Sequence, residues 1–429
     1  IIGKNTSMTF FNNIFSFLNN QFRQIKVGRY KVFLRKVNSL IDRILLITSG
    51  VWSIPCVLLI RLFRGIILFR LGTLRSDRIG HFAADSGQQF VANSLNSKRT
   101  LDIYWLSKYI SNKQLELMVR RNFLVFNFVR YLDYWNKLLP GGGRHIRPSS
   151  TSGSRDMLGI LNKSEGNMNF LSSEDKEAKD WMSSYGWKEG DPFVCILVRD
   201  SAYLKNNDFF KNDYDYSYHG YRDSNIENYI EAMEWLANQG IWVFRMGRQM
   251  HKPVPISHPK IIDYAFCENQ SDLLDIWMFA NCNLCISTGS GPDMVSDIYR
   301  RPLLFVNYIP ICNSISWSNA IHLPKHLIYR KTGKSLTLSE HIKHSYFTSQ
   351  QYLSAGIALV ELSSSEILQA VQERFKNVFE ESSVQNNKEN IIFWKIILQS
   401  DGASERHGFI HKGSGVADSF LKNNINWLK

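Results

Sequence analysis

A run of small residues between a predicted strand and a predicted helix carries the clearest chemistry in the sequence. The run reads Ser287, Thr288, Gly289, Ser290, Gly291, Pro292 and Asp293. Small residues let the backbone approach a ligand closely, and amides at the start of a helix favour an anion. The run is therefore a candidate phosphate site, with a tight turn that binds no ligand as the alternative. It matches neither the glycine-rich loop of simple ATPases nor the fingerprint of dinucleotide-dependent dehydrogenases, which disfavours both classes.

Arginines near the ends of neighbouring predicted strands extend this candidate site. They are Arg199, Arg222, Arg245 and Arg248, and Gly247 stands between the last two. A guanidinium group can bind a diphosphate through paired hydrogen bonds, so each arginine is a candidate phosphate ligand. An ordinary surface position is the alternative for each of them.

A second cluster follows the first predicted strand of the body. Five ionisable residues fall within eleven positions, namely Arg75, Asp77, Arg78, His81 and Asp85. A carboxylate or an imidazole that faces a ligand can accept a proton from a hydroxyl group. His81 and Asp85 are thus the first candidates for a general base, and Asp77 is the third. A purely structural role is the alternative, because isolated residues of these types are more often structural.

Two weaker patterns concern metals. Asp213 and Asp215 form a DxD pair in a tyrosine-rich loop, and Cys282 and Cys285 have the spacing of half a zinc site, without a second pair. We therefore expect no required metal and no required cofactor. The six cysteines are too few for a disulfide scaffold and stand among apolar residues, which indicates a reduced, cytoplasmic setting.

The elements that must position these residues alternate between strand and helix. Strands are predicted at 66–71, 100–106, 193–199, 241–246, 261–264, 284–287 and 303–307, and helices at 172–185, 225–238, 271–280, 292–299, 365–376 and 417–428. This alternation predicts parallel sheets that are covered on both faces. We expect an α/β fold with two Rossmann-like domains and a cleft between them, because one series of strands and helices begins at residue 66 and a second begins at residue 193. Ser271 is expected as a helix N-cap, and Gly240 as the residue after a helix C-cap.

The length of 429 residues is enough for two or three domains. We expect a helical region at 1–65, an N-terminal Rossmann-like domain at 66–185, a C-terminal one at 186–400, and a helical segment at 401–429 that returns to the first domain. Proline, glycine and serine mark residues 140–154 as a loop. A solvated loop is favoured there over a lid near an anionic ligand.

The net charge of +13 is concentrated at the N-terminal end. The first 75 residues hold twelve Lys or Arg and one acid, a net charge of +11, so the other 354 residues carry only +2. Apolar residues recur at helical spacing between 10 and 44, and 44–60 is an uncharged run of 17 residues that contains Gly50 and Pro55. The pattern is typical of helices that lie in an anionic membrane surface, and it favours a re-entrant or surface-embedded hairpin over a span. A helix packed on its own domain is the alternative.

Several segments together resemble a known family. They are LRSDRIGHF at 74–82, VRDSAYL at 198–204, YRDSNIENYIEAMEWLANQGIWVFRMG at 221–247, DIWMFANCNLCISTGSGPDMVS at 275–296, RPLLFVNYIP at 301–310 and LPKHLIYRKTGKSLTLSE at 323–340. The chain resembles, over about residues 40–360, the glycosyltransferases of bacterial surface-carbohydrate gene clusters, which build capsule, O-antigen and lipopolysaccharide. These are more distantly similar to other glycosyltransferases of the GT-B type.

The resemblance implies a GT-B fold, a nucleotide-sugar donor held mainly by the second domain, and a glycan or lipid-linked glycan acceptor that enters over the first. The candidate donor contacts are then Arg199, Arg222, Arg245, Gly247, Arg248, Ser287, Thr288, Gly289, Ser290, Gly291 and Asp293, and the candidate acceptor contacts are Arg75 and Arg78. The expected location is the cytoplasmic face of the bacterial inner membrane. The protein would be peripheral or monotopic there, held through residues 1–65.

Two other functions are compatible with the sequence. A nucleotide-sugar 2-epimerase of the same fold would turn over the donor alone, without an acceptor. A non-enzymatic protein would use its basic N-terminus to bind a membrane or a nucleic acid. We expect no nucleic-acid partner, because the basic residues alternate with long aliphatic runs and are not set on a polar surface with stacking aromatic rings.

Overall fold

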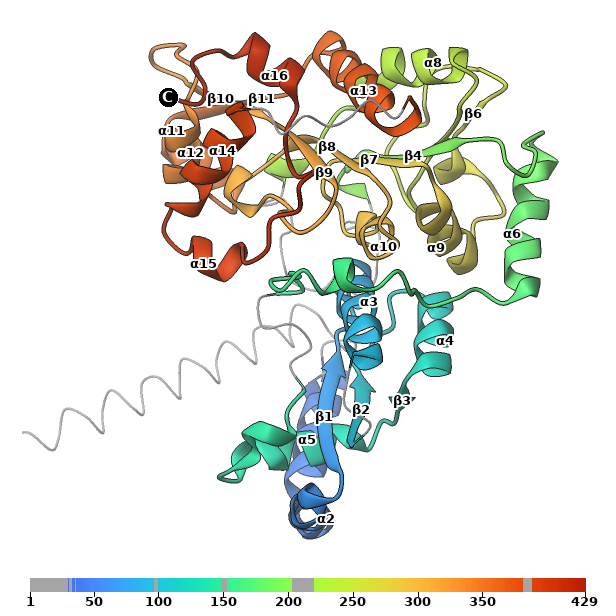
Figure 1. Ribbon diagram of the computed structural model, residues 1–429, viewed down its shortest axis with the longest axis vertical. Coiled ribbons are helices and arrows are strands. Elements are labelled where there is room, and N and C mark those ends of the chain that lie inside the picture. Colours follow the sequence, from blue (N-terminus) through green and yellow to red (C-terminus); the bar gives the residue numbers. More distant parts are fainter. Residues whose placement is uncertain are drawn as a thin grey trace, which may run out of the picture. The chain divides into compact units, whose positions relative to one another are not determined.

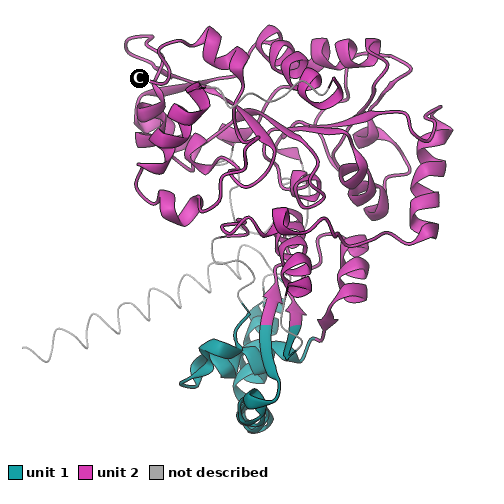
Figure 2. Ribbon diagram, viewed as in Figure 1, with its two compact units in different colours: residues 1–71, 99–103, 127–147 teal, residues 72–98, 104–126, 148–429 magenta. Residues whose placement is uncertain are grey.

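The computed structural model describes residues 30, 33–34, 36–95, 99–147, 153–202, 220–380 and 388–429. These residues fall into two compact units, coloured separately in Figure 2. Unit 1 comprises residues 1–71, 99–103 and 127–147, and unit 2 comprises residues 72–98, 104–126 and 148–429. The domain boundaries expected from the sequence, 1–65, 66–185, 186–400 and 401–429, stay predictions.

Unit 2 contains a seven-stranded sheet in the order β12-β9-β8-β7-β4-β5-β6, in which every pair of neighbouring strands is parallel (Figure 1). The strands are β4 (Phe193–Leu197), β5 (Trp242–Arg245), β6 (Ile261–Ile262), β7 (Leu284–Ser287), β8 (Leu303–Tyr308), β9 (Ala320–Pro324) and β12 (Gly415–Val416). The expected α/β class and parallel sheet are confirmed. The arrangement of two Rossmann-like domains around a cleft stays a prediction.

Two smaller sheets accompany it. One has the order β1-β2-β3, with β1 (Leu68–Leu74), β2 (Thr100–Leu106) and β3 (Leu124–Val125). The other pairs β10 (His326–Tyr329) with β11 (Ile357–Val360) in antiparallel fashion. The sequence prediction for β2 is confirmed at both ends. It is wrong for β1, which begins two residues later than expected, because residues 63–65 form a 3-10 turn at the end of the preceding helix.

Helices cover both faces of the large sheet, because side chains along each buried strand alternate between two apolar cores. Among the described residues of unit 2, the helices with at least eight residues are α3 (Ile79–Ser94), α4 (Lys113–Asn122), α6 (Ser172–Ser184), α8 (Ile230–Asn238), α9 (Asp272–Asn281), α13 (Ser364–Phe379) and α14 (Lys388–Leu398). The shorter ones are α10 (Asp293–Ile298), α11 (Leu338–Lys343), α12 (Ser349–Ser354), α15 (Ala403–Arg406) and α16 (Asp418–Asn423). In β4, Cys195 packs into the core that includes α9 and α10, and Val194 packs into the core that includes α8 and α13.

Two of the expected helix ends are confirmed by their capping contacts. The Ser271 hydroxyl accepts a hydrogen bond from the Leu274 amide at 3.1 Å at the start of α9. Gly240 follows the α8 C-cap with a φ of 87°. The helix expected at 417–428 is shorter: α16 ends at Asn423, and the chain then turns so that Trp427 is buried. Two contacts bear on the expected return of residues 401–429 to the N-terminal region. α16 packs on α13, and Gly408 lies against the backbone of Met157, which belongs to the expected N-terminal domain.

α3 packs closely against α10 and against the loop that connects β7 to α10. A Cβ atom added at Gly87 would lie 2.5 Å from Ile298 Cγ2, and one added at Gly80 would lie 2.8 Å from the Gly291 Cα atom. Larger residues at either position would push the two segments apart. The N-terminal turn of α3 is therefore held directly beside the loop that follows β7.

Unit 1 is built on a helix at 36–48, α2 (Gly50–Leu62) and α5 (Val129–Leu138). The small face of α2, formed by Gly50, Ser53 and Val57, is buried, and Gly50 lies against the Trp135 ring. Arg61 donates to the Asn136 side chain at 2.9 Å and to the Pro140 carbonyl at 2.7 Å. The large apolar side chains of α2 point away from these contacts, and Val51 and Leu62 are 86% and 76% exposed.

Among the described residues, no single helix is both long and apolar enough to cross a membrane. The helix at 36–48 and the segment Gly50–Gly65 meet the length and hydropathy criteria only as a pair, with a bend of 50° between them. The part of the expected amphipathic stretch that precedes residue 30 lies outside the described residues.

Candidate active site

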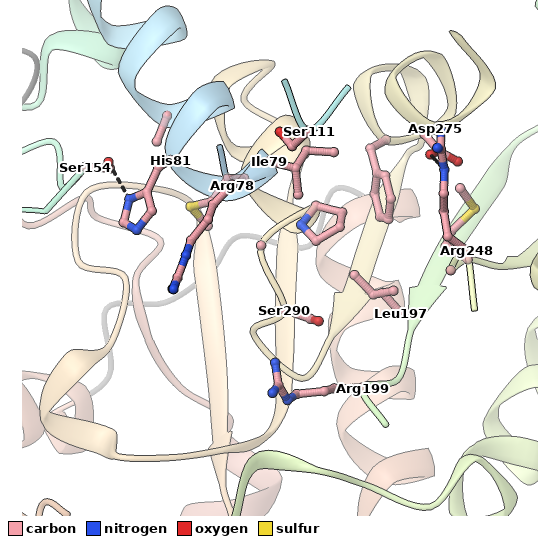
Figure 3. A pocket seen from close by; sticks show the side chains of 18 of the residues that line it. Arg78, Ile79, His81, Ser111, Ser154, Leu197, Arg199, Arg248, Asp275 and Ser290 are labelled. Atoms are coloured by element: carbon pink, nitrogen blue, oxygen red, sulfur yellow. Dashed lines mark hydrogen bonds and ion pairs between the residues drawn. The ribbon is translucent and has the colours of Figure 1, made fainter. Parts of the chain in front are cut away.

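A cavity of about 670 Å³ opens in unit 2 at the carboxyl ends of β4, β5 and β7 (Figure 3). The chain runs outward from β4 through β5 to β6, and then returns to β7 on the other side of β4. The boundary between β4 and β7 is therefore the point where the strand order reverses, which is where open parallel sheets bind ligands. The volume suits a small-molecule site.

The cavity has two walls with different origins. The first, the sheet wall, consists of residues that follow the strands: Leu197, Arg199, Asp200, Arg222, Met246, Gly247, Arg248, Gln249, Met250, Ser290, Gly291 and Pro292. The second, the helix wall, consists of the first turns of α3 and a loop segment before α6: Asp77, Arg78, Ile79, Gly80, His81, Ala84, Gly153, Ser154 and Arg155. Both walls belong to unit 2.

The loop at 287–291 does not offer the free amides that the sequence predicts. The Thr288 amide donates to the Leu197 carbonyl at 3.1 Å, and the Gly289 amide donates to the Ser287 hydroxyl at 3.1 Å. The Ser290 amide donates to the Asp293 carboxylate at 2.7 Å. These hydrogen bonds stabilise the loop itself, so an anion here must be bound by side chains instead.

Asp293 organises this loop from beneath. Its carboxylate is buried and accepts hydrogen bonds from the Ser290 amide and, at 2.6 Å, from the Ser287 hydroxyl. Burial raises the pKa of the Asp293 carboxyl, and the hydrogen bonds from Ser287 and the loop amides oppose that rise. The sequence prediction lists Asp293 as a donor contact, whereas its carboxylate is turned into the protein and does not line the cavity.

Two arginines of the sheet wall contact the loop at 287–291, Arg199 through its amide and Arg222 through its guanidinium. Arg199 pairs with Asp223 at 3.1 Å, and Arg222 donates to the Gly289 carbonyl. Burial, followed by the nearby Arg222 charge, lowers the pKa of Arg199. Two guanidinium groups whose charges act on each other favour an anionic ligand. Arg199 and Ser290 both line the cavity, and Figure 3 labels the two side chains.

The other predicted arginines are differently placed. Arg248 lines the cavity, but its guanidinium forms ion pairs with Asp272 and, at 2.7 Å, with Asp275, and these raise its pKa although burial lowers it. Arg245 does not line the cavity at all. It is 1% exposed and pairs with Asp263 at 3.0 Å, because its position in β5 directs it to the Asp263 side of the strand.

His81 is the imidazole that the helix wall presents to the cavity. Its Nδ1 atom lies 2.7 Å from the Ser154 hydroxyl, and among the described residues its Nε2 atom has no hydrogen-bond partner. Burial lowers the pKa of His81 to about 4, and the charges of Arg75 and Arg78 act in the same direction. The imidazole is therefore neutral at pH 7 and can accept a proton.

The other predicted residues of this cluster occupy three kinds of position. Asp77 lines the cavity and accepts a hydrogen bond from the Ser107 hydroxyl at 3.3 Å, and Arg78 is exposed at the α3 N-cap. Asp85 lies behind His81, fully buried, where burial raises its pKa to about 6. Arg75 does not line the cavity, and its amide donates to Asp85 at 3.4 Å.

The loop expected at 140–154 is not simply solvated. Gly153 and Ser154 line the cavity, and His145, in unit 1, is buried with its Nδ1 atom 2.7 Å from the Phe69 carbonyl. Sequence reasoning missed Ser154, Arg155 and Trp317 as cavity residues. No motif marks them, and the PGGGRHIRPSSTSGS composition that contains Ser154 indicates only a loop.

The metal patterns have little support in the described part of the chain. Asp213 and Asp215 lie outside the described residues. Cys282 and Cys285 are buried free cysteines, and no group of three or more His, Cys, Asp or Glu residues among those described is arranged to hold a metal ion.

No family model and no curated protein matches the chain. Among solved structures, it is similar to a glycosyl transferase of family 9 from Veillonella parvula, with a TM-score of 0.43 and 11% identity over 73% of this chain and 97% of that one. It is also similar to the ADP-heptose lipopolysaccharide heptosyltransferase II of E. coli (TM-score 0.35, 9% identity, 59% of this chain and 90% of that one). An E. coli heptosyltransferase with ADP follows (TM-score 0.29, 9% identity, 60% and 91%). All three TM-scores are below 0.5, so these similarities carry no argument about fold or activity.

Proposed function

We propose that this protein is a glycosyltransferase that moves a sugar from a nucleotide-sugar donor to a lipid-linked glycan of the bacterial surface. The observation that carries the proposal is the pairing of a basic sheet wall with a neutral imidazole on the helix wall of one cavity. Segments 74–82, 198–204, 221–247 and 275–296, which carry the sequence resemblance to surface-carbohydrate glycosyltransferases, supply most of both walls.

The sheet wall would hold the diphosphate of the donor. Arg199 and Arg222 provide the positive charge, and the Ser290 hydroxyl can donate a hydrogen bond. Negative charge grows on the leaving diphosphate as its bond to the sugar breaks, so fixed guanidinium groups stabilise that transition state without further reorganisation. We therefore propose a reaction that needs no metal.

The helix wall would activate the acceptor. His81 Nε2 accepts the proton of the acceptor hydroxyl while that oxygen forms its bond to the anomeric carbon, and the nucleoside diphosphate departs with the electron pair of the broken bond. Arg78, exposed beside His81 at the mouth of the cavity, is placed to contact a charged acceptor.

The direct test is turnover. The purified protein is incubated with UDP-, GDP-, CMP- and dTDP-sugars in the presence of EDTA, with and without lipid extracted from bacterial membranes, and nucleotide release and sugar transfer to lipid are measured. We expect sugar transfer from one donor class. The transfer should be lost in Arg222→Gln and kept in the control variant Arg120→Gln, which alters a surface arginine of α4. Conversion of the donor to its epimer without lipid would identify an epimerase instead, and no turnover of any donor would contradict both.

We further propose that unit 1 docks on an anionic lipid surface at the cytoplasmic face of the inner membrane. A helix on a soluble domain buries its large apolar residues, whereas α2 buries Gly50, Ser53 and Val57 and exposes leucines. Leu58, Leu59 and Leu62 are 54%, 55% and 76% exposed, and Arg43 and Arg64 are exposed in the same unit. Apolar insertion combined with basic flanks is the signature of interfacial helices.

Vesicle sedimentation tests this docking. We expect binding to vesicles that contain phosphatidylglycerol and weaker binding to pure phosphatidylcholine vesicles. The double variant Leu58→Ser/Leu62→Ser should lose binding, while Leu117→Ser, at an equally exposed leucine of α4, should keep it. Equal sedimentation of both variants would contradict the assignment of this surface.

A further inference from the structure

A chain of two short hydrogen bonds runs from the cavity into the core behind α3. His81 and Asp85 stand four residues apart, so they lie on the same face of the helix. The Ser154 hydroxyl is placed between them, 2.7 Å from His81 Nδ1 and 2.6 Å from Asp85 Oδ1. Figure 3 shows the contact between His81 and Ser154 at the edge of the cavity.

The available protons determine the direction of these bonds. An ionised carboxylate only accepts hydrogen bonds, so the single proton of the Ser154 hydroxyl is donated to Asp85. The Ser154 oxygen must then accept from His81, which places a proton on Nδ1. In a neutral imidazole this leaves Nε2 without a proton, and Nε2 is the atom that has no partner among the described residues.

The backbone holds Ser154 in this position at a cost. Its φ is 70°, in the left-handed region that residues other than glycine, asparagine and aspartate seldom adopt, and Gly153 before it has a φ of 60°. Gln88 donates to the Ser154 carbonyl at 3.3 Å, and Arg155 donates to the Asn313 carbonyl at 2.8 Å. Contacts of Gln88 on α3 and of the following residue, Arg155, thus hold an unfavourable conformation, which is typical of functional positions.

We propose that Ser154 and Asp85 are positioning residues that hold His81 in its Nδ1-protonated form, so that Nε2 faces the cavity as the general base. This inference rests on the proposed glycosyl transfer and names the groups that set its base. His81 is the catalytic residue. Ser154 and Asp85 act only through it, because Asp85 is fully buried and does not line the cavity.

The relay has a pH dependence that follows from its direction. The charged groups around it are Arg75, Arg78 and Asp77, and burial raises the pKa of Asp85 to about 6. Below that pH, Asp85 gains a proton and donates to Ser154, and the hydroxyl of Ser154 then donates to Nδ1. Nδ1 can no longer carry its proton, the neutral ring is protonated on Nε2, and the base is lost.

The first test measures the tautomer and needs no substrate. In protein labelled with 15N-histidine, the His81 signals are identified by their loss in His81→Gln. We expect a protonated Nδ1 and an unprotonated Nε2 at pH 7.5, a mixture of tautomers in Ser154→Gly, and no change in Ser86→Ala. Glycine suits the left-handed φ at 154, and the Ser86 hydroxyl bonds within α3 to the Phe82 carbonyl, outside the relay. A His81 ring protonated on Nε2 in the unaltered protein would overturn the inference.

The second test measures hydrolysis of the nucleotide-sugar that the turnover panel identifies, with water as the acceptor. We expect the hydrolysis rate constant of Ser154→Gly to fall 10- to 100-fold, with KM for the donor unchanged and with the acid limb near pH 6 displaced. An unchanged rate and pH profile would overturn the inference. If no donor is turned over, the proposed function fails, while the tautomer measurement still decides whether the relay exists.

Discussion

The polar groups of the two cavity walls form hydrogen bonds in different ways. In the sheet wall, amides of the loop at 287–291 donate hydrogen bonds within the loop and to Asp293. A ligand would therefore be bound there by side chains such as those of Arg199 and Arg222. In the helix wall, the polar atoms behind His81 are satisfied in a chain, and one ring nitrogen is left open toward the cavity. We propose that the first wall binds a fixed charge and that the second exchanges a proton. Substitutions in the two walls should therefore affect different measured quantities.

The largest expected effect separates chemistry from binding. His81→Gln removes the base and should lower the turnover number by about 10²- to 10⁴-fold, the usual contribution of general base catalysis. The donor dissociation constant should stay within about twofold of the unaltered value, because His81 lies on the helix wall. Steady-state kinetics and calorimetric titration of the donor measure the two quantities. Loss of donor binding in His81→Gln would show that the helix wall also binds the donor, which would contradict the division of roles between the two walls.

The next effect distinguishes two arginines that the sequence treats alike. Arg222→Gln should weaken donor binding by about 10- to 100-fold, since hydrogen bonds to charged groups contribute about 1.5–3 kcal/mol. Arg245→Gln should instead lower the free energy of unfolding by about 3 kcal/mol, because it removes a buried guanidinium and leaves the half-buried Asp263 carboxylate without its ion-pair partner. Urea unfolding and donor titration of both variants test this. A folded Arg245→Gln protein with weakened donor affinity would show that Arg245 contacts the donor after all.

Asp85→Asn should change activity and stability in opposite directions. The folded protein raises the pKa of Asp85 from 3.8 to about 6, so it binds more protons than the unfolded chain between these values, and stability falls as pH rises through that window. The asparagine variant avoids this cost, which is about 3 kcal/mol at pH 7. We expect it to unfold at higher urea concentration than the unaltered protein at pH 7, with the difference vanishing near pH 4, while its turnover falls. An Asp85→Asn protein that is less stable than the unaltered protein at pH 7 would contradict the inference that the buried, ionised Asp85 carboxylate lowers the free energy of unfolding.

The smallest effect concerns the contact between the walls. Gly80→Ala would place a Cβ 2.8 Å from the Gly291 backbone and force one wall to move, whereas Gly87→Ala meets the Ile298 side chain further along α3. Both should cost about 1–3 kcal/mol of stability, as overpacking usually does. Only Gly80→Ala should also weaken donor binding, by a few fold. Equal donor affinities in the two variants would mean that the spacing of the walls does not matter for the donor.

The sequence predicted the scaffold of the site better than its contacts. Strand and helix periodicity located β2, β4, β7 and α9, because apolar spacing and caps are local properties. Motif position also located the loop at 287–291 and His81. The direction of Arg245 depends on which side of β5 it occupies relative to its neighbours, and the use of the loop amides depends on Asp293 folding back beneath them. Ser154 reaches His81 from 73 residues away in the chain, and no local pattern encodes such a contact.

The proposed function requires first that the sheet wall binds a nucleotide-sugar through Arg222 and Arg199. A thermal-shift panel of UDP-, GDP-, CMP- and dTDP-sugars with EDTA tests it most directly, because a ligand that binds only the folded state must raise the melting temperature. We expect a rise of a few degrees with one nucleotide class in the unaltered protein and in Arg120→Gln, and none in Arg222→Gln. No rise with any class, or the same rise in Arg222→Gln, would contradict it.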